Sequence, residues 1–218
     1  MPRRAYPLIS GEIYHVYNRT IANQSAFTSE NHFQRAVNLI DFYCRSQTPI
    51  RYSYFIRLTL KTQTEILSSL SSYRSKIICF CLMPTHFHFL LNQSSDEGIK
   101  NFIHDFQDSY VKYFNILNRR NGALFQASFK AVRITSGPQF LHVSRYIHLN
   151  PYSSGLIKNL NQLVKYRWSS FPCYADQIKY DFLNIQHLMN NFTDLNSFLS
   201  FTLNQAEYQK TLNFIKHH

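Results

Sequence analysis

The sequence feature that most constrains the fold is a pair of short adjacent segments, each with the pattern of a β-strand. Residues 76–82 (KIICFCL) form an unbroken apolar run, which is typical of a strand buried on both faces. Met83, Pro84 and Thr85 interrupt the run, and residues 86–91 (HFHFLL) then begin with alternating histidine and phenylalanine. The two segments predict an antiparallel hairpin whose second strand has one polar and one apolar face.

The other periodic segments complete the order of elements. Apolar residues at helical spacing predict helices, and alternating β-branched and aromatic residues predict strands. Strands are expected at residues 11–19 and 129–135, and helices at residues 29–44, 98–117 and 138–149. The last of these helices is expected to end near Asn150, because Pro151 disfavours α-helical geometry at the residue before it.

The order of these elements indicates the fold class. Residues 45–75, with a predicted helix at 63–73, read as an insertion between the first helix and the hairpin. The order predicts an α+β protein with a ferredoxin-like βαββαβ-type antiparallel sheet and helices on one face. Residues 1–175 are expected to form one domain, and residues 176–218, with helical stretches at 185–189 and 205–215, a C-terminal helical extension.

Composition indicates which binding partners and which cellular compartment to expect. Lys and Arg number 23 against 12 Asp and Glu, which gives a net charge of +11 and a pI of about 9.6. This balance favours nucleic acid as partner, although a membrane surface or a solvated basic face would leave the same charge. No window approaches the roughly 18 apolar residues of a membrane span, and the N-terminus has no apolar leader, so we expect a cytoplasmic protein without membrane contact.

The cysteines do not have the spacing of a metal site. They lack the paired C-x-x-C pattern of a zinc ribbon, and in a cytosolic chain they are expected to be small buried hydrophobes. They are Cys44, Cys79, Cys81 and Cys173.

His86 and His88 form the first candidate site. Two residues apart on a strand, they project from the same face with Cα atoms about 6 to 7 Å apart, so that both imidazoles can bind one metal ion. The interpretation that they belong to an amphipathic strand without a ligand stays open for this motif alone. A histidine-triad hydrolase or cupin-like site is disfavoured, because Leu90 stands where a further histidine would be expected.

Tyr146 and Asn150 form the second candidate pair. Four residues apart on a predicted helix, they share one face, so that a phenol and an amide oxygen can address one point. Asn150 is therefore a candidate third, oxygen ligand of the metal. Taken alone, a single tyrosine among 15 is more often a packing residue, and only the combination with the histidine pair favours chemistry.

These motifs together carry a family resemblance. The segments GEIYHVYNR, CLMPTHFHFLL, LFQASFKAVRI, SRYIHLNPYSSGL and YRWSSF, spread over about residues 8–175, resemble in order and spacing the single-tyrosine HUH transposases. The similarity is closest to the REP-associated tyrosine transposase branch of these IS200-like transposases. Thr85 departs from the family pattern, which often has Asn before the first histidine, and residues 45–75 are longer than in the shortest members.

The resemblance implies an activity and a role for each candidate residue. Tyr146 is expected to be the nucleophile that cleaves single-stranded DNA near hairpins, forming a covalent 5′-phosphotyrosine and a free 3′-hydroxyl. His86, His88 and Asn150 are expected to bind the metal, and mixed nitrogen and oxygen ligands suit Mg²⁺ or Mn²⁺. Because the phosphotyrosine retains the energy of the phosphodiester, the expected reaction is strand transfer, with residues 1–175 as the catalytic domain.

Basic residues near the predicted sheet edges and loops are candidates for DNA contact. Their expected role is to bind phosphate, although each is as readily a solvated surface charge. These candidates are Arg19, Arg119, Arg120, Lys130 and Arg133. Tyr14, Tyr17 and Phe125 could stack on unpaired bases, but core packing is the favoured interpretation for all three.

Two other functions stay open at this stage. The first is a domesticated hairpin-DNA-binding module that does not cleave, which is disfavoured because the histidine pair, Tyr146 and Asn150 are all present. The second is a replication initiator or plasmid relaxase, which usually occurs within a longer chain. The sequence does not distinguish between a monomer and a homodimer.

Overall fold

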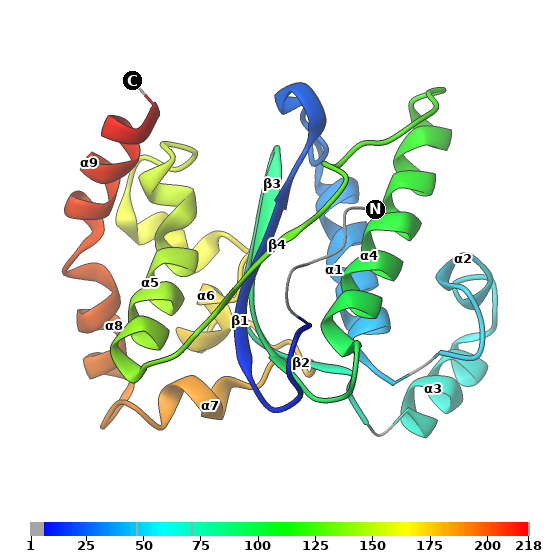
Figure 1. The fold of residues 1–218 in the computed structure, drawn as a ribbon, viewed down its shortest axis with the longest axis horizontal. Coiled ribbons are helices and arrows are strands. Elements are labelled where there is room, and N and C mark those ends of the chain that lie inside the picture. The colour runs from blue at the N-terminus through cyan, green and yellow to red at the C-terminus, as the bar shows by residue number, and fades with distance from the viewer. Residues whose placement is uncertain (1–6, 47, 71, 218) are drawn as a thin grey trace.

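The structure is built around a four-stranded antiparallel sheet with strand order β2-β3-β1-β4 (Figure 1). The computed structural model describes residues 7–46, 48–70 and 72–217. The strands are β1 (Ile13–Arg19), β2 (Ser75–Met83), β3 (His86–Gln93) and β4 (Lys130–Arg133). With α1 (Glu30–Cys44) between β1 and β2 and α4 (Gly98–Leu117) between β3 and β4, this is the predicted βαββαβ arrangement.

The other helices divide into two groups. The insertion contains α2 (Tyr52–Phe55) and α3 (Leu60–Ser69), and a short 3-10 turn, η1 (Ile21–Asn23), follows β1. The C-terminal part contains α5 (Gly137–Ser153), η2 (Leu160–Lys165), α6 (Phe171–Tyr174), α7 (Ile185–Met189), α8 (Leu195–Leu203) and α9 (Ala206–His217). The expectation about the N-terminal leader falls partly on residues 1–6, which lie outside the described residues.

The two faces of the sheet are covered by different helices (Figure 1). Helices α1 and α4 pack on one face, here called the α4 face, and α5 with the C-terminal helices packs on the other, the α5 face. The predicted fold class is confirmed. The expected helices on one face are the two crossover helices, and the prediction missed that α5 and its neighbours cover much of the opposite face.

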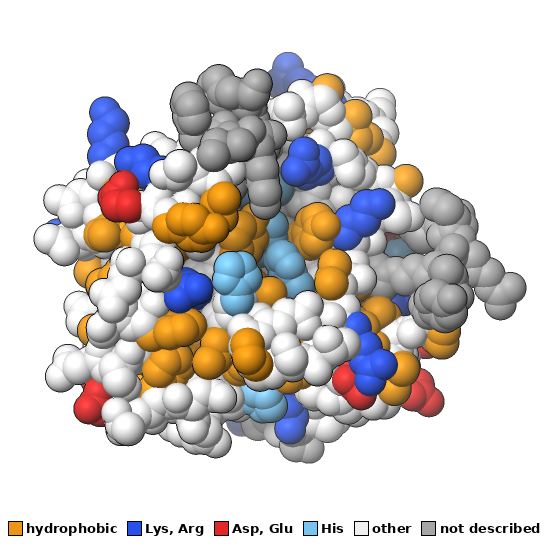
Figure 2. All heavy atoms as spheres, turned by 60° about the vertical axis from the view of Figure 1, so that its left-hand side comes forward, with side chains coloured by type: hydrophobic (Ala, Val, Ile, Leu, Met, Phe, Trp, Pro, Cys, Tyr) orange, Lys and Arg blue, Asp and Glu red, His pale blue; other side chains and the backbone are white. Residues whose placement is uncertain are grey.

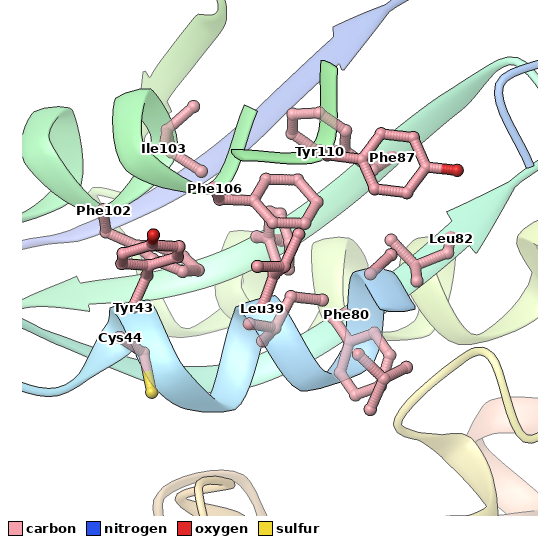
Figure 3. Close-up of a cluster of buried hydrophobic side chains, with 14 of the residues drawn as sticks. Leu39, Tyr43, Cys44, Phe80, Leu82, Phe87, Phe102, Ile103, Phe106 and Tyr110 are labelled. Atoms are coloured by element: carbon pink, nitrogen blue, oxygen red, sulfur yellow. The ribbon is translucent and has the colours of Figure 1, made fainter. Parts of the chain in front are cut away.

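The α4 face is an aromatic hydrophobic core. Phe87 and Phe89 of β3 point to this face and contact Phe102 and Phe106 of α4, with ring centroids 5.4 to 5.9 Å apart. Figure 3 shows Phe87, Phe102 and Phe106 in this cluster. All four rings are fully buried. Burial of aromatic side chains contributes roughly 2 to 3 kcal/mol each, so this face fixes the position of β3 in the molecule.

Strand β2 is buried on both sides, as its apolar run predicts. Phe80 and Leu82 belong to the core of the α4 face, and Ile78 and Cys81 belong to the core of the α5 face. The outer edge of β2 is covered by the chain that follows α5: for example, the amide N–H of Ser170 donates to the carbonyl of Phe80 at 2.9 Å. The four cysteines are buried and free, as expected.

The predicted end of α5 was wrong. The helix continues through Pro151 to Ser153, and the amide N–H of Ser154 closes the last turn on the carbonyl of Asn150 at 3.0 Å. Pro151 lacks an N–H and therefore leaves the carbonyl of Ile147 without its helical donor. All residues from Ile147 to Ser153 are buried, so side-chain packing outweighs this local cost.

Candidate active site

The two candidate histidines lie on the α5 face of β3, as the alternation predicts. In the register of the sheet, His88 stands opposite Tyr17 of β1, and His86 stands opposite Arg19. Directly opposed residues of an antiparallel pair point to the same face. Since side chains two apart on β1 share a face, His15 also projects beside the histidine pair. The site therefore has a floor made of two neighbouring strands.

The imidazole rings on this floor contact one another. The rings of His86 and His88 have centroids 5.1 Å apart and are nearly perpendicular. Nε2 of His15 lies 3.0 Å from Nδ1 of His88, and Nδ1 of His86 lies 3.1 Å from Oγ1 of Thr85. The Nδ1 atom of each of the two candidate histidines, His86 and His88, is thus in contact with a neighbouring protein group.

Helix α5 brings Tyr146 and Asn150 to the same place. The ring of Tyr146 meets His88 edge-on with centroids 5.4 Å apart, and lies 5.9 Å from the ring of His15. Asn150, one turn later, is 2% exposed, and its amide nitrogen is buried with no hydrogen-bond partner among the described residues. The structure thus places Tyr146 against the histidine pair, with Asn150 one turn further along the same helix.

Burial sets the ionisation of these groups. It lowers the pKa of His15 to about 4 and that of His88 well below its usual value, the latter helped by the neighbouring imidazoles and Arg19. Both rings are therefore neutral at neutral pH. Burial raises the pKa of Tyr146, and the nearby Asn150 amide partly offsets this rise, so the phenol also keeps its proton in the resting protein.

The position of α5 is fixed by polar contacts as well as by apolar packing. Nε2 of His148 lies 2.9 Å from Oγ of Ser170, which in turn accepts the backbone N–H of Phe80 in β2 at 2.9 Å. From α9, the Gln209 amide donates to the backbone carbonyl of Tyr146 at 3.1 Å. These contacts tie the helix that carries Tyr146 to the sheet on one side and to the C-terminal helices on the other.

Three side chains at the site carry atoms that are able to bind a metal ion. Within residues 7–46, 48–70 and 72–217, no group of three or more His, Cys, Asp or Glu side chains is placed to hold a metal. The set here differs because its third member is an amide: His86 and His88 offer imidazole nitrogen, and the Asn150 side chain offers an amide oxygen. Such a set would hold a divalent cation through both nitrogen and oxygen.

The predicted DNA-binding residues do not share one surface. Lys130 of β4 stands opposite Tyr17 and so faces the site, and exposed Arg19 lies at the end of β1 beside His86. Arg133 lies on the opposite face, because it stands opposite Tyr14, and its guanidinium is paired with Glu12, with Nε 3.1 Å from the carboxylate. Of the predicted set, Lys130 and Arg19 are therefore those on the α5 face of the sheet.

The other two predicted arginines lie in the loop after α4. This loop approaches the site end of the sheet, since the amide N–H of Gln126 donates to the carbonyl of Arg19 at 2.9 Å. Arg119 is exposed, whereas Arg120 donates to the carbonyl of Ala123 at 2.9 Å and so holds the loop. Figure 2 shows histidine side chains near the middle of the molecule's surface, with more Lys and Arg than Asp and Glu around them.

Sequence reasoning missed two members of the site. His15 was not named, and Tyr17 was interpreted as core, as were Tyr14 and Phe125. The last two are indeed buried in the core of the α4 face, but Tyr17 is half-buried on the other face, 5.5 Å from the ring of His88. The alternation of β1 separates Tyr14 from Tyr17, and this signal could have placed Tyr17 with His15.

Comparison with known proteins relates this site to a known family. Residues 48–150 match the family model described as "Transposase IS200 like", and this range contains the histidine pair, Tyr146 and Asn150. The chain is also similar to the solved structure of a REP-associated tyrosine transposase bound to a REP hairpin, with a TM-score of 0.57, 15% identity, and coverage of 84% of this chain and 89% of that one. Residues 48–150 are thus similar to the IS200-like transposases, and the fold is similar to that of a REP-associated tyrosine transposase.

The remaining comparisons add less. A putative transposase from Deinococcus radiodurans R1 aligns over 66% of this chain and 95% of its own, with 12% identity and a TM-score of 0.38. None of the curated proteins matches this chain. Among the helices in the described parts of the chain, none is long and apolar enough to cross a membrane.

Proposed function

We propose that this protein is an IS200-like transposase that cleaves and rejoins single-stranded DNA through a covalent 5′-phosphotyrosine formed on Tyr146. The observation that carries the proposal is the convergence of Tyr146 and Asn150, one turn apart on α5, with His86 and His88 of β3. In this proposal residues 1–175 form the catalytic domain, and residues 176–218 form the extension that supports α5.

Tyr146 is the nucleophile in this proposal. A phenol is a weak nucleophile while it holds its proton, and burial raises the pKa of Tyr146, so the proton must leave as the attack begins. Asn150 favours the phenolate, since its amide lowers the pKa of the phenol.

The bond changes balance without any further reactant. The phenolate oxygen bonds to phosphorus while the bond from phosphorus to the 3′ oxygen breaks, and that oxygen leaves with the electron pair and takes up a proton. The number of phosphodiester bonds is unchanged, so a second DNA 3′-hydroxyl can reverse the step and join new ends without ATP.

His86, His88 and Asn150 would hold the divalent cation, Mg²⁺ or Mn²⁺. When bound, such an ion orients the scissile phosphate and offsets the negative charge that develops on it. The residues themselves exclude water from that position, because His88 and Asn150 are 6% and 2% exposed. The chain thus supplies a nucleophile and a set of donors on the α5 face, of which His88 and Asn150 are buried.

The open part of the α5 face is the proposed path of the DNA. Helix α5 packs on β2 and β3, whereas Lys130 and Val132 of β4 are exposed on the same face as Tyr17 and His15. A single strand lying there would meet a cation for its phosphates and aromatic rings for its bases. The REP hairpin in the solved relative makes hairpin DNA the first substrate to test.

A covalent-adduct gel tests the proposal. Labelled single-stranded hairpins from the DNA flanking the gene are incubated with the full chain and Mg²⁺ or Mn²⁺, with EDTA as the metal-free arm. We expect a metal-dependent adduct that Tyr146→Phe abolishes. Tyr17→Phe is the matched control, because this tyrosine also borders His88, 5.5 Å away between ring centroids, yet is not the proposed nucleophile.

The outcomes separate the alternatives. An adduct lost in Tyr17→Phe and kept in Tyr146→Phe would transfer the nucleophile to β1. Hairpin binding without any adduct, across several flanking sequences and both metals, would favour the non-cleaving hairpin-DNA-binding module. Cleavage of unstructured strands at rates equal to hairpins would overturn hairpin recognition while leaving the chemistry in place.

A further inference from the structure

His15 is in direct contact with a candidate metal ligand. It lies on β1, outside the residues that match the family model, and its Nε2 is 3.0 Å from Nδ1 of His88. The two rings are nearly parallel, with an angle of 24° and centroids 5.2 Å apart. A nitrogen-to-nitrogen distance of this length requires one proton between the two atoms, since two lone pairs or two N–H groups facing each other would repel.

The position of that proton determines what His88 can do. If His15 donated it, His88 would carry its own proton on Nε2 and could not bind a metal through that atom. If His88 donates it from Nδ1, its Nε2 keeps a lone pair. Metal-binding histidines usually donate their second ring N–H to a neighbouring acceptor, which fixes tautomer and ring orientation.

The other candidate ligand has the same arrangement. Oγ1 of Thr85 lies 3.1 Å from Nδ1 of His86, and a threonine hydroxyl can accept a hydrogen bond from that nitrogen. Both histidines thus use Nδ1 for a protein neighbour, one on the turn before β3 and one on β1. The same tautomer in both rings would present Nε2 of both to one cation.

The geometry gives His15 a supporting position and not that of a third ligand. Its Nε2 is directed at His88, and within the described residues no three-histidine metal group is found. The ring is packed on its other sides by Tyr17, 5.0 Å away, and Tyr146, 5.9 Å away. These rings restrict its rotation and hold Nε2 toward His88.

We propose that His15 is a positioning residue that accepts a hydrogen bond from Nδ1 of His88 and so presents Nε2 of His88 to a divalent cation. This inference rests on the proposed function for the identity of the ligand. It makes a separate statement about the metal-free protein, in which His88 is the Nδ1–H tautomer because of His15.

Three variants of the full chain test the proposal. His15→Leu removes the acceptor and keeps the volume. His15→Gln places an amide oxygen, which accepts hydrogen bonds, close to where Nε2 stood. His104→Leu is the matched control, because this histidine is on α4, away from the α5 face, and its side chain is 54% exposed. Thermal unfolding of each variant verifies that it is folded.

The first measurement is the tautomer of His88 in metal-free protein. Two-bond proton–nitrogen spectra of nitrogen-15 histidine distinguish the two neutral tautomers, and a His88→Gln variant assigns the signal. We expect the Nδ1–H form in the wild type, the His15→Gln variant and the control, and a mixture in His15→Leu. An Nε2–H tautomer in the wild type, or no change in His15→Leu, overturns the inference.

The second measurement is Mn²⁺ binding by calorimetry. Loss of a partner that orients a ligand weakens metal binding about 10- to 100-fold, so His15→Leu should fall in that range, while His15→Gln and the control stay within about 3-fold of the wild type. Equal losses in both His15 variants would make His15 a ligand or a packing residue and overturn the proposal. A wild type that shows the predicted tautomer but binds no Mn²⁺ would contradict the proposed function alone.

Discussion

The two faces of the sheet differ in the side chains that cover them. The α4 face is covered by two helices whose contact with the sheet is almost entirely aromatic and aliphatic, as the rings of Phe87, Phe102 and Phe106 illustrate (Figure 3). The α5 face also has a hydrophobic core, but polar side chains are buried within it. These include His88, Ser144, His148, Asn150, Ser153, Ser170 and Gln209.

This difference separates stability from chemistry. A buried polar group without a hydrogen-bond partner lowers the free energy of unfolding by about 1 to 3 kcal/mol. Buried polar groups are therefore expected where they orient another side chain or helix. On the α5 face the polar groups hold the tyrosine helix and the histidine rings, whereas the helices of the α4 face contact the sheet mainly through apolar side chains. Substitutions on the α4 face should therefore unfold the protein, and substitutions on the α5 face should remove activity from a folded protein.

Adjacent residues of β3 give the largest expected contrast. Phe87→Ala opens a cavity in the α4 face and should lower the free energy of unfolding by about 3 to 5 kcal/mol. His88→Ala removes a proposed metal ligand and should abolish the DNA adduct while costing less stability, because a smaller side chain is lost. Urea unfolding and the adduct gel measure the two effects, and an active His88→Ala protein would contradict the division of faces.

Loss of the hydrogen bonds between α9 and α5 should give an intermediate effect on stability and on adduct formation. Gln209→Leu removes the donor to the carbonyl of Tyr146 and to Oγ of Ser153, at 3.1 and 3.2 Å. We expect a loss of about 1 to 2 kcal/mol of stability and an adduct rate several-fold lower, since two hydrogen bonds are lost and α5 is held less firmly. The same change one turn earlier, Gln205→Leu, is the control, because Gln205 is exposed. Equal rates in the two variants would exclude a positioning role for α9.

The charges on β4 should give a smaller contrast in DNA binding. Lys130 faces the site, and Arg133 faces away and is bound to Glu12. Lys130→Ala should weaken binding of single-stranded DNA by a few-fold and reduce the slope of log K against log salt by about 0.7, the value for one phosphate contact. Arg133→Ala should leave both quantities unchanged. Fluorescence anisotropy over a salt series measures them, and equal effects of the two changes would move the DNA path to the sheet edge.

Local periodicity was enough to predict most of the elements that carry the candidate site. The alternation over residues 86–91 placed the histidines and phenylalanines on opposite faces, and the aromatic spacing over 98–117 matched α4 from end to end. The insertion's helix was expected at 63–73 and lies at Leu60–Ser69. Helix α8 was missed, although Leu195, Phe198 and Leu199 have helical spacing and Asp194 forms a capping box before them.

The rest depended on contacts between distant parts of the chain. His15 and His88 are 73 residues apart, and only the pairing of β1 with β3 brings them together. Likewise, the burial that carries α5 past Pro151 comes from helices that follow it, so the local rule for proline gave the wrong end. Spacing alone could have separated Lys130 from Arg133, since residues three apart on a strand face opposite sides.

The smallest expected effect tests the α4 side, at a polar group on its rim. His32 of α1 is buried, and its Nδ1 lies 2.8 Å from Oγ1 of Thr28 and accepts that residue's N–H at 3.4 Å. Burial lowers the pKa of His32, so the folded state favours the neutral ring. The contribution of the neutral His32 ring to stability is therefore present above the unfolded pKa of about 6.5 and is lost as the pH falls below that value.

Replacing the ring with an acceptor that does not titrate, His32→Asn, should leave stability at pH 7.5 nearly unchanged and reduce the loss of stability at pH 5. Urea unfolding at the two pH values measures this, and an identical pH dependence in both proteins would place the acid sensitivity on the α5 face, where the other buried histidines lie.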